Sequence, residues 1–120
     1  MKLEVGMYVR TKDGISKCIK VIPIRENSFM YEFDKEVYED VNFLTYSELE
    51  KYKSSSNIID LIEVGDYVNG NKVLDKEDYL LWVFDNEKQD TLYYNEEDIK
   101  SIVTSQQFEK MSYKKGDSNE

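Results

Sequence analysis

The chain has 120 residues, with 25 acidic and 16 basic side chains, so its formal net charge is −9. It contains no histidine and one cysteine, Cys18, which excludes zinc-finger sites, histidine-containing catalytic triads and an intramolecular disulfide framework. The acidic excess argues against direct nucleic-acid binding, which needs clustered lysine and arginine. The hydrophobic content of 40% suffices for one domain or two very small ones.

The first predicted elements form a hairpin followed by an aromatic strand. Residues 4–9 lead into a turn at 12–14 and then into an alternating, β-branched stretch at 15–22. The Asp13-Gly14 dipeptide predicts a type I′ turn, because that turn needs positive φ at both central residues. An aromatic strand is expected at 29–33, ending at Asp34. Cys18 lies in the alternating stretch, so we expect a small buried hydrophobic side chain.

Short helical segments are predicted further along the chain. The best candidate is 45–52, where Thr45 and Glu48 form a capping-box pattern. Asn95 is expected to begin a second helical turn, since acidic residues follow it at 96–98, where the helix dipole favours negative charge. Thr104 or Ser105 is expected to cap a last helical turn through residue 110.

An internal repeat is the strongest signal in the sequence. The segment at 4–9 reappears at 63–68 with five of six positions identical. Each copy is followed by a glycine turn (Asn69-Gly70 in the second copy), a β-branched stretch and an aromatic strand, at 80–84 in the second copy. The copies close with apolar segments at 57–62 and 98–103. Short strands separated by turn residues predict a mainly β fold.

The opening pattern of each copy resembles the first hairpin of SH3-like barrels. That resemblance implies two tandem SH3-like β-barrel units with one or two short helices. The first unit would span 1–62 and the second 63–105, followed by a C-terminal segment and tail at 106–120. A single antiparallel barrel, whose hairpins happen to look alike, is the alternative.

Carboxylates are abundant, but their spacing does not indicate catalysis. Asp98 and Lys100 form one nuclease-like triplet without an acidic partner on an upstream strand, a match expected by chance at this composition. The acidic stretches at 75–78 and 96–98 lack the spacing of a calcium-binding loop. We therefore predict no enzyme activity, no cofactor and no metal site.

Ten tyrosines and one tryptophan in an acidic chain favour a protein-binding surface, because tyrosine provides large contact area at low entropic cost. An acidic, tyrosine-rich surface can dock on a basic protein patch, placing carboxylates where nucleic-acid phosphates would otherwise lie. The candidate contacts form one acidic and aromatic run: Tyr31, Glu32, Asp34, Glu36, Tyr38, Glu39 and Asp40.

A pocket for a small nucleotide messenger is the alternative binding site. Such a pocket needs an aromatic side chain for base stacking and basic side chains for phosphates. The first candidates are Arg10, Arg25, Lys72 and Trp82.

The second half of the chain resembles small proteins of phages and prophages of low-GC Gram-positive bacteria. The resemblance covers 55–70, SSNIIDLIEVGDYVNG, and 99–109, IKSIVTSQQFE. Small acidic phage accessory proteins frequently inhibit host defence. Some anti-CRISPR proteins occlude the basic DNA channel of a nuclease, and other phage proteins sequester the nucleotide signals of defence systems.

These observations predict a non-enzymatic, phage-type binding protein. It would inhibit a host antiviral defence complex, such as a CRISPR nuclease, through an acidic, tyrosine-rich surface that competes with nucleic acid. The alternatives are a sponge for a nucleotide immune signal and a phage structural or assembly adaptor. The expected partner is a host defence protein with a basic surface, not nucleic acid or a membrane, and homo-oligomerisation stays open. With no signal peptide or spanning apolar run, the expected location is the host bacterial cytoplasm.

Overall fold

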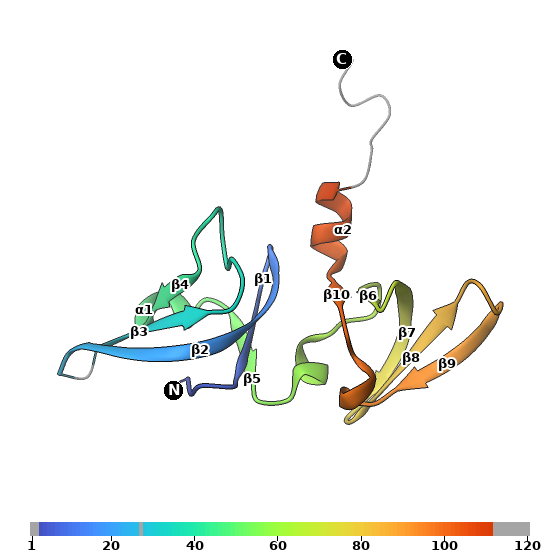
Figure 1. Ribbon diagram of the computed structural model, residues 1–120, viewed down its shortest axis with the longest axis horizontal. Helices are drawn as coiled ribbons and strands as arrows, with labels where there is room; N and C mark the ends of the chain where they lie inside the picture. Colours follow the sequence, from blue (N-terminus) through green and yellow to red (C-terminus); the bar gives the residue numbers. More distant parts are fainter. Residues whose placement is uncertain (1–2, 27, 112–120) are drawn as a thin grey trace, which may run out of the picture.

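The computed structural model describes residues 3–26 and 28–111 (Figure 1). Its first half contains β1 (Tyr8–Thr11), β2 (Gly14–Arg25), β3 (Ser28–Phe33), β4 (Phe43–Thr45), α1 (Tyr46–Leu49), β5 (Lys53–Ser55) and the 3₁₀ helix η1 (Ile58–Leu61). Its second half contains β6 (Tyr67–Val68), β7 (Asn71–Glu77), β8 (Leu80–Asp85), β9 (Asp90–Tyr94), the 3₁₀ helix η2 (Glu96–Asp98), β10 (Ile102–Val103) and α2 (Ser105–Met111).

The strands form two antiparallel five-stranded sheets rather than one. The first has the order β4-β3-β2-β1-β5 and the second the order β10-β6-β7-β8-β9. Figure 1 shows them side by side, with β1, β10 and α2 in the middle of the molecule. The prediction of a mainly β fold with one or two short helices is confirmed, and the helices are α1 and α2. Pairings among the described strands leave both sheets open, so neither is a closed barrel, and the SH3-like assignment stays a prediction.

The two halves repeat the same local geometry, as their sequences indicate. Gly6 and Gly65 both have positive φ, 95° and 101°. The N–H of Gly6 donates to the Cys18 carbonyl at 2.8 Å, and the N–H of Gly65 donates to the Val73 carbonyl at 3.0 Å. An irregularity in strand pairing then follows Cys18 in β2 and Val73 in β7. The sequence repeat is therefore also a structural repeat.

The hairpin turns differ between the halves. In the second, Asn69 and Gly70 both have positive φ, as a type I′ turn requires. In the first, Thr11 pairs with Gly14, so the loop residues are Lys12 and Asp13. Neither of them has positive φ, so the prediction of a type I′ turn at Asp13-Gly14 is wrong.

The predicted helix caps are present. Thr45 Oγ1 accepts from the Glu48 N–H at 3.3 Å, and Glu48 Oε1 accepts from the Thr45 N–H at 2.9 Å. Thr104 Oγ1 accepts from the Gln107 N–H at 3.2 Å at the start of α2. Polar groups at these helix starts satisfy N–H groups that the helix itself leaves unbonded.

Two hydrophobic cores lie under the sheets. The first is formed by Leu3, Val9, Cys18, Tyr31, Phe33, Val37, Leu44 and Leu49. The second is formed by Ile15, Ile59, Leu61, Ile62, Val68, Val73, Leu81 and Val83. Cys18 is fully buried as expected, and burial raises the pKa of its thiol.

Two segments of the predicted first unit pack in the second core. Ile15 of β2 and Ile59 and Leu61 of η1 belong to that core, although the predicted first unit spans 1–62. For η1 the reason is its place in the chain, since only a short segment separates it from β6 of the second sheet. The boundaries at 62/63 and 105/106 stay a prediction, and residues 112–120 of the predicted tail lie outside the described residues.

Candidate functional site

The loop between β3 and β4 carries most of the predicted contacts, and one buried side chain anchors it. Val37 is fully buried in the first core. Its N–H donates to the Val41 carbonyl at 2.7 Å, and the Val41 N–H donates to the Tyr38 carbonyl at 2.6 Å. Asp40 has a φ of 65°, which closes this tight turn. The loop backbone is therefore held from inside by packing and hydrogen bonds.

Further bonds tie both ends of the loop to β2 and its turn. The N–H of Lys17 donates to Asp34 Oδ1 at 2.8 Å, and Ser16 Oγ donates to the Glu36 carbonyl at 3.3 Å. The Glu39 N–H donates to Asp13 Oδ2 at 3.3 Å. These contacts leave the acidic side chains on the outside, and the exposed ones are Asp34, Glu36, Glu39 and Asp40.

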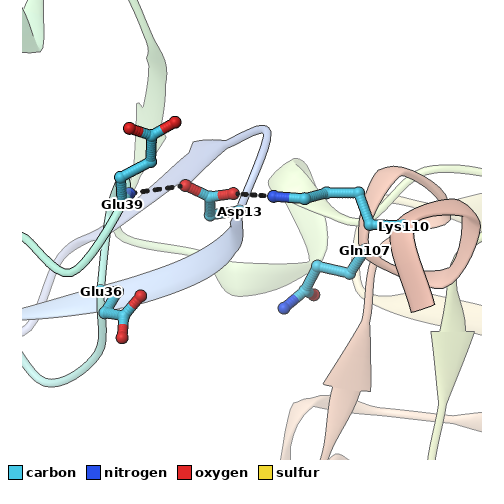
Figure 2. A pocket seen from close by; sticks show the side chains of 5 residues that line it. All are labelled: Asp13, Glu36, Glu39, Gln107 and Lys110. Atoms are coloured by element: carbon cyan, nitrogen blue, oxygen red, sulfur yellow. Dashed lines mark hydrogen bonds and ion pairs between the residues drawn. The ribbon is translucent and has the colours of Figure 1, made fainter.

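An acidic cleft of about 250 Å³ separates this loop from α2 (Figure 2). Asp13, Glu36 and Glu39 line one side of the cleft. Gln107 and Lys110 of α2 line the other, and Lys110 Nζ lies 2.8 Å from Asp13 Oδ1. This hydrogen bond holds the pKa of Asp13 below its ordinary value and raises the pKa of Lys110. Three acidic side chains and one lysine therefore line the cleft.

The structure corrects one predicted contact. Tyr31 is fully buried in the first core, so it cannot touch a partner, and burial raises the pKa of its hydroxyl. The alternation of β3 explains this, because Tyr31 and Phe33 lie on the same, inner face of the strand. Glu32 points the other way and is half-buried, as is Tyr38 in the loop.

Arg10 is also unavailable for the ligand role considered in the sequence analysis. It is 7% exposed and forms a buried ion pair with Asp66 of the second half. Its Nη1 also donates to the Leu61 carbonyl at 2.9 Å, and its Nη2 to Gln106 Oε1 at 2.8 Å. Burial by itself would lower the pKa of Arg10, but the hydrogen bond and charge of Asp66 raise it. The guanidinium joins the two halves and is not free to bind a phosphate.

The other three candidate ligand residues do not converge with Arg10. Arg25 ends β2 in the first sheet, whereas Lys72 and Trp82 lie on β7 and β8 in the second. Trp82 Nε1 donates to Glu77 Oε1 at 3.3 Å, and the Trp82 ring packs at 5.5 Å from the Tyr93 ring. The predicted nucleotide pocket built from these four residues is therefore wrong.

Sequence reasoning missed the residues that complete the acidic cleft. Asp13 belongs to the turn of the first hairpin, and Gln107 and Lys110 lie more than ninety positions away in α2. For the contact between the halves, the sequence contains one indication: Asp66 is the position at which the second copy of the repeat differs from the first. Among the described residues no group of three or more potential ligands is placed to hold a metal ion.

Comparison with protein-family models, curated proteins and solved structures finds no match to this chain. Of the helices within 3–26 and 28–111, none is long and apolar enough to cross a bilayer.

Proposed function

We propose that this chain is a non-enzymatic binding protein whose acidic loop, residues 34–40, docks on the basic nucleic-acid-binding surface of a partner protein. The exposed carboxylates carry the recognition, and Tyr38 adds a half-buried aromatic contact beside them. The partner class is a nuclease complex of host antiviral defence, such as a CRISPR nuclease. This choice of partner rests on the resemblance of 55–70 and 99–109 to phage proteins.

One observation carries the proposal: on a fixed backbone the loop holds four exposed carboxylates that belong to no ion pair of the described residues. The ion pairs of the described residues involve Arg10 and Lys110 as the cations, so no cation is paired with Asp34, Glu36, Glu39 or Asp40. Like charges held together cost energy in the free protein. A basic partner removes that cost, and a pre-ordered loop binds with little further loss of entropy.

The test is a competition experiment with purified CRISPR nuclease–guide complexes and fluorescently labelled target DNA. Fluorescence anisotropy measures how much protein is needed to displace the DNA. The triple variant E36Q/E39Q/D40N is expected to need at least about tenfold more protein, because each lost surface charge weakens a screened attraction. The wild-type effect should also fall steeply as salt is raised.

A matched control separates the loop from the overall charge. The triple variant E87Q/D90N/E97Q removes the same number of exposed carboxylates from the second half, so its net charge equals that of the loop variant. Displacement by the control should stay close to wild type. Two results would refute the proposal. One is an equal loss of DNA displacement in the two triple variants, and the other is that the wild-type protein displaces DNA from none of the nuclease–guide complexes. Such a result would favour the alternative of a phage structural or assembly adaptor, whose partners would be virion components.

A further inference from the structure

A second, smaller cleft of about 120 Å³ lies at the junction of the two sheets, and three lysines from distant segments line it. Lys17 comes from β2, Lys35 from the loop after β3, and Lys100 from the segment that precedes β10. All three side chains are exposed. The pairing of β2 with β3 brings Lys17 close to the start of the loop that holds Lys35. Lys100 joins them only because the two halves pack together, and no pattern in the sequence links it to the other two.

The sheet register explains why Lys17 faces this cleft. Lys17 pairs with Tyr8 across β1 and β2, and Ile15 lies two positions before it on the same face. Ile15 is a member of the second core, and Tyr8 packs against that core. The face of the first sheet that carries Lys17 is therefore turned toward the second sheet. Tyr8 and isoleucines from both halves supply an apolar floor.

The charge in this cleft is opposite to that of the whole protein. Asp34 is the one carboxylate among the lining residues, and its Oδ1 accepts the backbone N–H of Lys17. No ion pair of the described residues involves the three lysines. Lys100 Nζ makes one long contact, 3.5 Å to the Glu97 carbonyl. Three ammonium groups and one carboxylate leave a local excess of positive charge in a chain of net charge −9.

We propose that this cleft binds a phosphate group, with the ammonium groups of Lys17, Lys35 and Lys100 as its ligands. Lysine is a common binder of phosphate, acting as a point charge with three donors. Gathering like charges costs energy that a bound anion would offset. The volume is well below the roughly 300–1,000 Å³ of pockets that enclose a drug-sized ligand. It therefore suits a single phosphate, either the free ion or the phosphate of a nucleotide whose remainder contacts Tyr8 and the isoleucines of the lining.

The two proposals share the start of the acidic loop, because Asp34 and Lys35 line this cleft, whereas Glu36, Glu39 and Asp40 do not. The variant K17Q/K100Q leaves the whole loop unchanged, so failure of the phosphate site is distinguishable from failure of the docking loop. The test is a titration of the full chain with inorganic phosphate at constant ionic strength, followed by backbone amide chemical shifts in NMR. Saturating shifts centred on residues 17, 35 and 100, with a Kd of about 1 mM or tighter, are the expected result. A second titration uses AMP.

The AMP titration distinguishes the two sources of phosphate. Tighter binding of AMP than of inorganic phosphate, with shifts that extend to Tyr8 and Ile99, indicates a nucleotide. Equal affinity indicates that the cleft takes the free ion.

Matched variants decide whether the lysines act as a site. K17Q/K100Q is expected to weaken binding at least about tenfold. K20Q/K88Q removes two exposed lysines elsewhere and should change the affinity less than twofold. If K17Q/K100Q does not fold, the exposed loop variant K35Q replaces it, with a smaller loss expected. Equal losses in both double variants, or no saturable shifts in the wild type, would overturn the proposal.

Discussion

The two copies of the repeated segment, residues 4–9 and 63–68, fold in the same way but make different contacts with the rest of the molecule. Both have an exposed valine at the second position, Val5 or Val64, and both end with a fully buried one, Val9 or Val68. The copies differ at the fourth position, where the first has methionine and the second aspartate. Everything that the two copies share concerns the local turn and strand, so their common sequence specifies local structure alone.

The differing position determines how the halves are joined. Met7 packs beside the first core. Asp66, at the equivalent place, is fully buried and binds Arg10. It also accepts the N–H of Glu63 at 2.7 Å and the N–H of Ser105 at 2.8 Å. The equivalent positions of the repeat therefore have different roles: Met7 packs against one core, and Asp66 joins the two sheets and α2.

The largest effect is expected from breaking this joint. D66N removes the charge opposite a buried guanidinium, and such a loss costs about 3–5 kcal/mol of folding free energy. Urea unfolding followed by circular dichroism measures it. The equivalent change in the other copy, M7L, should cost less than about 1.5 kcal/mol, because it nearly conserves volume.

Two further variants test whether the charge itself is responsible. E63Q removes a half-exposed carboxylate 3.7 Å from the same guanidinium, and exposed pairs are worth about 0–1 kcal/mol. R10M/D66L leaves no buried charge unpaired and should recover part of the loss. A D66N effect as small as that of E63Q would show that the joint does not depend on the ion pair.

Replacing the glycine of either copy by alanine is expected to lower the free energy of unfolding by an intermediate amount, and by the same amount in both copies. A Cβ built on Gly6 or on Gly65 meets no atom within 4 Å, so the cost of alanine there is conformational. Forcing an L-residue to positive φ costs about 1–2 kcal/mol. G6A and G65A should therefore destabilise the protein by similar amounts in thermal unfolding. A difference of more than about 1 kcal/mol between the two variants, comparable to the expected effect itself, would contradict the structural equivalence of the copies.

The smallest effect concerns the two hairpin turns. Asp13 of the first turn contacts α2 through Lys110, whereas Asn69 of the second turn accepts the N–H of Lys100 at 2.8 Å through a neutral amide. The pKa of Asp13 is lowered in the folded state. Its contribution to the free energy of unfolding is therefore complete above its unfolded pKa of about 3.9. It is lost as the pH falls through the lower, folded value.

Carboxyl-detected NMR of Asp13 measures this titration directly. The expected midpoint lies below that of an unstructured aspartate, and K110Q should move it back toward the ordinary value. The N–H resonance of Lys100 bonded to Asn69 serves as a control, since no titrating side chain accepts that bond. An Asp13 midpoint unchanged by K110Q would show that the contact with α2 does not form in solution.

Much of the local structure could be predicted from the sequence. The repeat, the Asn69-Gly70 turn, the aromatic strands and the Thr45 capping box all depend on residues within a few positions of one another. Burial of Tyr31 was within reach of the same reasoning, since strand alternation places it on the face of Phe33. Tyr31 is aromatic and stands beside Glu32, a combination that favours a contact surface. In the structure its side chain is instead buried in the first core.

The candidate sites could be predicted only in part. The carboxylates at 34–40 are exposed as a binding loop requires, but their neighbours Asp13 and Lys110 come from the first hairpin and the last helix. Arg10 looked like a free cation, and the structure buries it against Asp66. The three lysines of the junction cleft lie on unrelated segments, so no window of sequence contains them.

By itself, then, the sequence determined the mainly β character, the duplicated hairpin and the acidic loop, because hydrogen-bonded turns and strand alternation are set by neighbouring residues. Tertiary structure alone decided which face of each sheet is covered, which charges are paired across the junction and which remain exposed. Those outcomes depend on contacts between residues more than fifty positions apart, such as Arg10 with Asp66, whose energies exist only once both halves are folded and packed together.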